Sequence, residues 1–149
     1  MKLDLVLREL HRAEKALARD LLTTSDRHHA EHEVHHLARD LAAWSAEHVR
    51  EVARAGRAFD LELTEDVPGP APAGSPGPDP GVRLLADLRR LHRRAAGVSL
   101  DWELLAQGAQ AARDDGLLGL ASRCHPRTLR QLKWTNAMLK VLSPQILTS

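Results

Sequence analysis

The sequence predicts an all-α protein: a four-helix bundle of two antiparallel helical hairpins joined by a long proline-rich crossover. Aromatic residues make up only 3% of the chain and β-branched residues are scarce, so the composition disfavours a β-sheet. Apolar residues recur at the 4-3 spacing of an inward-facing helical stripe in several stretches. Most of the eight prolines gather between Pro68 and Gly81, where no helix can continue.

The composition bounds what kind of protein this is. The chain of 149 residues is expected to form one domain, residues 1–149, with a real core, because 43% of it is hydrophobic and 28% charged. Its net charge of +1, with both signs interspersed, argues against a nucleic-acid partner. No stretch is apolar enough to span a membrane, and the single cysteine excludes an internal disulfide. We expect a cytoplasmic protein.

The first hairpin is expected to contain helices at about residues 3–23 and 30–55. The first should end in the cluster Thr23–Asp26, whose residues favour caps over helix interiors, and the second at Gly56. The short link between them makes the two helices antiparallel. The inward stripe of the first helix consists of Leu3, Leu7, Leu10, Glu14, Leu17 and Leu21.

The proline-rich crossover, residues 68–81, decides the topology. At the polyproline rise it can reach about 43 Å, whereas the second helix is about 39 Å long. The crossover can therefore travel the length of the bundle, so that the third helix runs parallel to the second. A loop of a few residues would have sufficed for a simple up-and-down bundle. A flexible tether between hairpins packed in another order is the alternative.

The second hairpin is expected to contain helices at about residues 82–113 and 117–142. Asp114-Asp115-Gly116 should end the third helix and cap the fourth. Pro126 lies inside the fourth helical pattern and is expected to kink or restart it, and Ser143-Pro144 should close it.

Each of three predicted stripes holds one residue that is unusually polar for a core position: Glu14, His48 and His125. Glu14 and His48 come from facing helices about one turn apart, so they can form a hydrogen-bonded core pair. With His125 as a third ligand, the same residues could instead hold a divalent transition metal. The residues leave both interpretations open, and no cofactor is assigned with certainty.

Three segments carry a resemblance to a known family. LRELHRAEKAL (Leu7–Leu17), WSAEHVREVARAG (Trp44–Gly56) and Cys124-His125-Pro126-Arg127-Thr128 resemble helical elements of small bacterial ferritin-like proteins of the YciE/YciF type. The resemblance covers about half of the chain. It implies a ferritin-like four-helix bundle in which Glu14, His48 and His125 would stand at metal-ligand positions.

The chain departs from the family's ligand pattern. A di-iron bundle needs a glutamate from each of two helices and a Glu-x-x-His pair from each of the other two. Ser45 and Ser122 stand three positions before the two histidines, where the glutamates belong. Asp87 and Asp101 each fall one position off the stripe of the third helix, which is therefore expected to offer no inward carboxylate. The metal ligands are degenerate, and a di-iron oxidase or iron store is disfavoured.

The densest group of potential ligands is HHAEHEVHH, residues 28–36. On a helix His28, His32 and His36 share one face, and Glu33 precedes His36 by the spacing of a carboxylate–histidine pair. A surface metal site formed by these four residues is one interpretation. A polar, solvent-facing start of the second helix is the other.

The function predicted from the sequence is that of a non-catalytic bundle that acts through self-association or a protein partner. Trp134, Met138 and Val141 share a face beside the inner stripe of the fourth helix and would supply the contact. No phosphate-binding loop, nucleophile elbow or zinc-protease motif is present, so the residues favour a protein that is not an enzyme. The alternative is a ferritin-like metal-binding protein with a reduced site.

Overall fold

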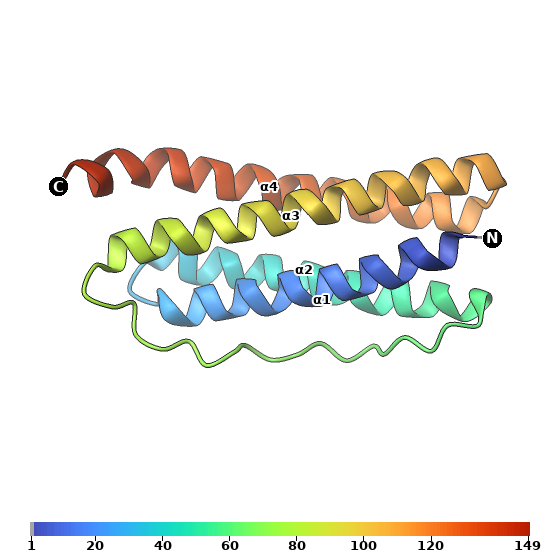
Figure 1. The fold of residues 1–149 in the computed structure, drawn as a ribbon, viewed down its shortest axis with the longest axis horizontal. Coiled ribbons are helices and arrows are strands. Elements are labelled where there is room, and N and C mark those ends of the chain that lie inside the picture. The colour runs from blue at the N-terminus through green and yellow to red at the C-terminus, as the bar shows by residue number, and fades with distance from the viewer. Residues whose placement is uncertain (1) are drawn as a thin grey trace.

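The computed structural model describes residues 2–149, and Figure 1 shows them as a bundle of four long helices. The helices are α1 (Leu3–Arg27), α2 (His32–Gly56), α3 (Pro80–Ala112) and α4 (Asp115–Thr148). A short 3-10 helix, η1 (Arg57–Phe59), follows α2, and the part of the chain described contains no strand. The predicted all-α four-helix bundle is therefore confirmed.

The helices form two antiparallel hairpins, α1–α2 and α3–α4, and α1 lies beside α3. Leu3, at the start of α1, lies against Gly108 near the end of α3, whereas Arg27 at the end of α1 pairs with Asp87 near the start of α3. α1 and α3 are thus antiparallel, so α2 and α3 run parallel, as the reach of the crossover predicted. One long crossover is also the topology of ferritin-like bundles.

The crossover is an extended segment along the outside of α1 (Figure 1). His11 Nε2 lies 2.7 Å from the Thr64 carbonyl oxygen, and Thr23 Oγ1 accepts a hydrogen bond of 3.0 Å from the Ala71 amide. Arg27, at the end of α1, donates from Nε to the Ala73 carbonyl in the middle of the crossover at 2.6 Å. Side chains of α1 thereby satisfy backbone groups that the proline-rich segment cannot pair with itself.

The end of α1 differs from the prediction. The helix continues past Thr23 to Arg27, and α2 begins at His32. Of the polar residues expected to cap the helix, Thr23, Thr24 and Ser25 are buried, and the hydroxyl groups of Thr23 and Ser25 bind backbone groups instead. Thr23 Oγ1 donates to the Arg19 carbonyl and also accepts from the crossover, and Ser25 Oγ donates to the His35 carbonyl at 2.6 Å. Tertiary partners therefore outweigh the local capping preference.

Two prolines also fail to interrupt α4, which runs on to Thr148 rather than ending near residue 142. Pro126 and Pro144 remove the amide donors for the carbonyls of Ser122 and Lys140. Both prolines, Ser122 and Lys140 are exposed, so water can satisfy the freed carbonyls. The starts of α3 and α4 lie within two residues of the prediction, where Asp79 and Asp114 cap them.

Candidate functional site

The centre of the bundle holds a polar pair that links α1 and α2. The side chains of Glu14 and His48 are both 0% exposed, and His48 Nδ1 lies 2.7 Å from Glu14 Oε2. From α3, Trp102 Nε1 donates to the same oxygen at 3.1 Å. The rings of His48 and Trp102 meet edge to face, with centroids 5.8 Å apart. The 4-3 stripes of three helices bring these residues to one level.

Only one polar atom of each side chain in the Glu14–His48 pair has a hydrogen-bond partner. Glu14 Oε1 and His48 Nε2 are buried, and the structure gives neither a hydrogen-bond partner. A buried polar atom without a partner raises the free energy of the folded state, so each unpaired atom requires an explanation. The hydrogen bonds of His48 and Trp102 to the other carboxylate oxygen offset part of that cost.

The structure does not gather the predicted metal ligands. His125 Nε2 lies 2.9 Å from Ser99 Oγ, and residues 2–149 contain no group of three His, Cys, Asp or Glu side chains placed to hold a metal ion. Trp102 brings an indole N–H, which donates but does not coordinate. One carboxylate and one imidazole do not fit the di-metal centre of ferritin-like bundles.

A second buried polar cluster lies where the α1–α2 turn meets α3. Asp87 is buried, and its Oδ2 accepts hydrogen bonds from Arg27 Nη1 at 2.9 Å and His28 Nε2 at 2.7 Å. Arg83 and Arg90 lie within 4 Å of the other carboxylate oxygen. Burial acts to raise the pKa of Asp87, but the bonds from His28 and Arg27 outweigh it and hold that pKa below its ordinary value.

The Asp87 cluster contradicts two predictions made from the sequence. The third helix does offer an inward carboxylate, because α3 turns Asp87 toward the α1–α2 turn. His28 is not on the surface face of α2: it follows the last residue of α1, is buried and binds Asp87. His32, Glu33 and His36 are exposed on the first turns of α2, and the imidazole centroids of the two histidines are 5.7 Å apart.

The polar residues of α4 pack on α2. Gln131 Nε2 donates to the Leu41 carbonyl at 3.0 Å and to Ser45 Oγ at 2.9 Å. Cys124 Sγ donates to Glu51 Oε2 at 3.5 Å. Burial, reinforced by the charge of Glu51, raises the pKa of the Cys124 thiol well above its usual range, so the thiolate that a nucleophile needs is not formed at neutral pH.

The contact surface that the sequence predicts on α4 is not exposed as a whole. Met138 is buried and Trp134 is half-buried against the core, so only Val141 of the three predicted contact residues is exposed. Trp134 and Met138 therefore pack within the bundle, which was the alternative to an intermolecular contact. The proposed interface at Trp134 and Met138 is therefore wrong.

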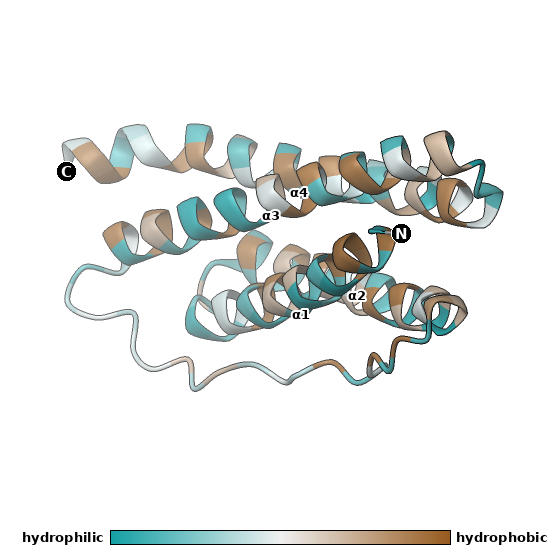
Figure 2. Ribbon diagram, turned by 45° about the vertical axis from the view of Figure 1, so that its right-hand side comes forward, coloured by the Kyte–Doolittle hydropathy of each residue, from teal (hydrophilic) through white to brown (hydrophobic). Residues whose placement is uncertain are grey.

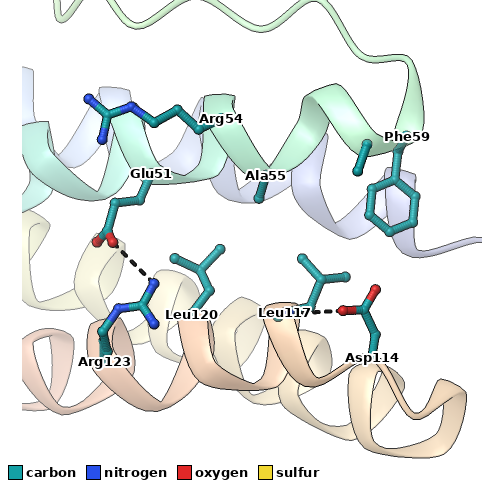
Figure 3. A pocket seen from close by; sticks show the side chains of 10 residues that line it. Glu51, Arg54, Ala55, Phe59, Asp114, Leu117, Leu120 and Arg123 are labelled. Atoms are coloured by element: carbon teal, nitrogen blue, oxygen red, sulfur yellow. Dashed lines mark hydrogen bonds and ion pairs between the residues drawn. The ribbon is translucent and has the colours of Figure 1, made fainter.

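An open groove of about 410 Å³ lies between α2 and the start of α4 (Figure 3). Its apolar wall consists of Ala55, Phe59, Leu117 and Leu120, which face one another across the gap. Of the charged groups at its rim, Arg123 pairs with Glu51 and Arg54 with Glu65, and the carboxylate of Asp114 accepts a hydrogen bond from the Leu117 amide. This groove can accept an apolar group, but it leaves no charged group free to orient a ligand.

A longer groove of about 900 Å³ runs between α1 and α3. Its α3 side is basic in the first half of the helix, where Figure 2 shows a run of strongly hydrophilic turns, and it holds Arg89, Arg90, Arg93 and Arg94. Farther along α3 the lining changes to two exposed leucines and a carboxylate: Leu100, Asp101 and Leu104.

Several charges in this groove are unpaired. Neither Arg93 nor Asp101 forms an ion pair or a side-chain hydrogen bond with any other part of residues 2–149, whereas Arg94 pairs with Asp20 and Arg12 with Glu9. Asp101 is half-buried. Its burial, together with the charge of Glu9, raises the pKa of its carboxyl group. The groove therefore has charged groups that a second molecule could complement.

Comparison of the chain with family models, with curated proteins and with solved structures finds no match. None of the helices between residues 2 and 149 has an apolar stretch long enough to span a membrane.

Proposed function

We propose that this chain is a non-catalytic helical bundle that acts by associating with a second copy of itself. The polar residues at its centre, Glu14, His48 and Trp102, contact one another and line neither the groove between α2 and α4 nor the groove between α1 and α3. A substrate in these grooves would not reach them. The potential nucleophile, Cys124, is buried and protonated.

The observation that carries the proposal is the α1–α3 face. Leu100 and Leu104 are 60% and 59% exposed there, beside a half-buried carboxylate and an arginine that form no ion pair or side-chain hydrogen bond within residues 2–149. Exposed apolar side chains beside polar groups are typical of protein–protein contacts. The groove between α2 and α4 lacks this combination, because its arginines are paired with Glu51 and Glu65 and its Asp114 accepts the Leu117 amide.

Sedimentation of the wild type and of a Leu104→Arg variant tests this function. We expect a dimer at tens of micromolar for the wild type and a shift toward monomer for the variant. Leu129→Arg is the matched control, because Leu129 is an exposed leucine of α4, outside the α1–α3 groove. A wild type that stays monomeric throughout would contradict self-association and would favour a different protein partner.

The alternative function, binding of a divalent transition metal, rests on one observation: Glu14 Oε1 and His48 Nε2 are buried without a partner. Elemental analysis of protein purified without a histidine tag tests it. Stoichiometric metal that is lost in Glu14→Gln but retained in a His32→Ala, His36→Ala variant would support this site. If the metal is lost only in the His32→Ala, His36→Ala variant, the surface histidines bind it instead.

A further inference from the structure

The exposed side of α3 is arranged symmetrically about Gly97. On the N-terminal side of Gly97, at three, four and seven residues, lie the arginines Arg94, Arg93 and Arg90. On the C-terminal side, at the same separations, lie Leu100, Asp101 and Leu104. Residues separated by three, four and seven positions share one helix face, and all six residues line the α1–α3 groove.

Gly97 itself is exposed in the middle of a helix, and no neighbouring atom lies within 4 Å of the position that a Cβ atom would take. Packing within the chain therefore does not require a glycine there, although glycine weakens a helix interior. Helix axes can approach most closely where the residues at the contact are small. A glycine at the midpoint of the symmetric pattern marks the place where another helix can come nearest.

We propose that two copies of this chain pair through antiparallel α3 helices about a two-fold axis at Gly97, so that Arg93 of each copy contacts Asp101 of the other. This inference rests on the proposed self-association and assigns its surface and register. In an isologous contact, residue i of one copy meets residue j of the other and the reverse, so each complementary pair occurs twice.

The same register provides a partner for both exposed leucines of α3. Leu100 faces Arg94 of the other copy, and Leu104 faces Arg90 of the other copy. Arginine covers apolar side chains with its aliphatic stem while its guanidinium stays in water or in an ion pair. Arg94 and Arg90 keep their contacts with Asp20 and Asp87 at the same time, because only their stems are used.

Charge complementarity favours a second copy over a polyanion as the occupant of this face. A polyanion would pair with the arginines but would leave Leu100 and Leu104 exposed and place negative charge near Asp101 and Glu9. A second copy in this register neutralises Asp101 and covers the leucines together. An acidic partner protein would satisfy the arginines alone, and the experiment distinguishes that case.

The test is a charge-reversal cycle followed by sedimentation at several protein concentrations. Arg93→Asp places a carboxylate opposite each Asp101, and Asp101→Arg places an arginine opposite each Arg93, so each should raise the dimer dissociation constant by on the order of tenfold. The double variant Arg93→Asp, Asp101→Arg exchanges the charges and should restore the wild-type constant. Arg130→Asp and Asp40→Arg are controls, because both residues are exposed and lie on α4 and α2.

The outcomes of this test distinguish the proposed α3–α3 contact from the more general proposal of self-association. A wild-type dimer that the single reversals weaken and the double reversal restores supports the α3–α3 contact. A wild-type dimer whose dissociation constant is changed no more by the two single reversals than by the two controls overturns this register and leaves self-association standing. A wild-type monomer overturns both, and binding of an acidic protein that Arg93→Asp abolishes would then identify the other occupant. Helical circular dichroism of each variant verifies that it is folded.

Discussion

His48 Nδ1 lies 2.7 Å from Glu14 Oε2, and both side chains are fully buried between α1 and α2. Trp102 from α3 donates to the same oxygen, so one carboxylate oxygen connects three helices. Such a pair stabilises the fold less than an apolar pair of similar volume, but removal of one partner alone is costly. The hydrogen bond from Trp102 to Glu14 therefore connects the α1–α2 hairpin to α3, and the buried pair itself is not expected to add greatly to stability.

Glu14→Leu is expected to lower the free energy of unfolding by about 1–3 kcal/mol, because it leaves the imidazole of His48 and the indole N–H of Trp102 without an acceptor. Adding His48→Leu should recover part of this loss, since it removes one unpaired group. Urea unfolding of the wild type, both single variants and the double variant gives the coupling energy. Strict additivity of the two single effects would show that the two side chains do not interact in solution.

The Asp87 cluster makes stability depend on pH. The pKa of Asp87 is lower in the folded state than in the unfolded chain, so its contribution is complete above the ordinary aspartate pKa of about 4. That contribution is lost as the pH falls through the lower folded-state pKa. Asp87→Asn should therefore destabilise the protein by about 1–3 kcal/mol at neutral pH.

The difference in unfolding free energy between the wild type and Asp87→Asn should shrink as the pH is lowered toward about 3. Asp40→Asn is the control, because Asp40 is exposed and forms no ion pair in the described chain. Its effect on unfolding should be small at every pH. A difference for Asp87→Asn that stays constant with pH would show that its carboxylate is not held by Arg27 and His28 in solution.

Pro126→Ala is expected to stabilise the protein by about 1–3 kcal/mol, because proline in a helix interior is disfavoured and alanine restores the amide donor for the Ser122 carbonyl. Pro144→Ala should have a smaller effect, because the last turn of a helix frays. Thermal unfolding measures both. Destabilisation by Pro126→Ala would mean that the proline ring makes a contact that α4 requires.

Most of the fold follows from local patterns. The 4-3 stripes predict the four helices, and the reach of the Pro68–Gly81 segment predicts that α2 and α3 are parallel. The errors lie at helix ends. Thr23 and Ser25 favour caps locally, but their hydroxyl groups bind the crossover and α2. Pro144 predicts a helix end, but α4 is exposed there. Water can therefore bind the carbonyl oxygen that the proline leaves without an amide donor.

The candidate site was predictable only in part. The stripes place Glu14 opposite His48, and the structure confirms that they pair. The stripe of α3 does not reveal that Asp87 is buried, because the partners of Asp87 are supplied by the α1–α2 turn. A residue beside a stripe can be buried where a second element covers it. In the same way the sequence shows the arginine run of α3, but it does not show that Arg93 and Asp101 form no ion pair with the described part of the chain.

Disulfide formation at Gly97 tests the proposed two-fold contact most directly. Gly97→Cys in a Cys124→Ala background places one thiol per copy beside the axis, within the short Cα separation that a disulfide requires. Gln107→Cys in the same background is the control, because it is exposed on the same helix but ten residues from the axis. Under mild oxidation the account predicts a covalent dimer for Gly97→Cys and slow or no cross-linking for Gln107→Cys. Equal cross-linking at both positions, or none at Gly97→Cys, would contradict it.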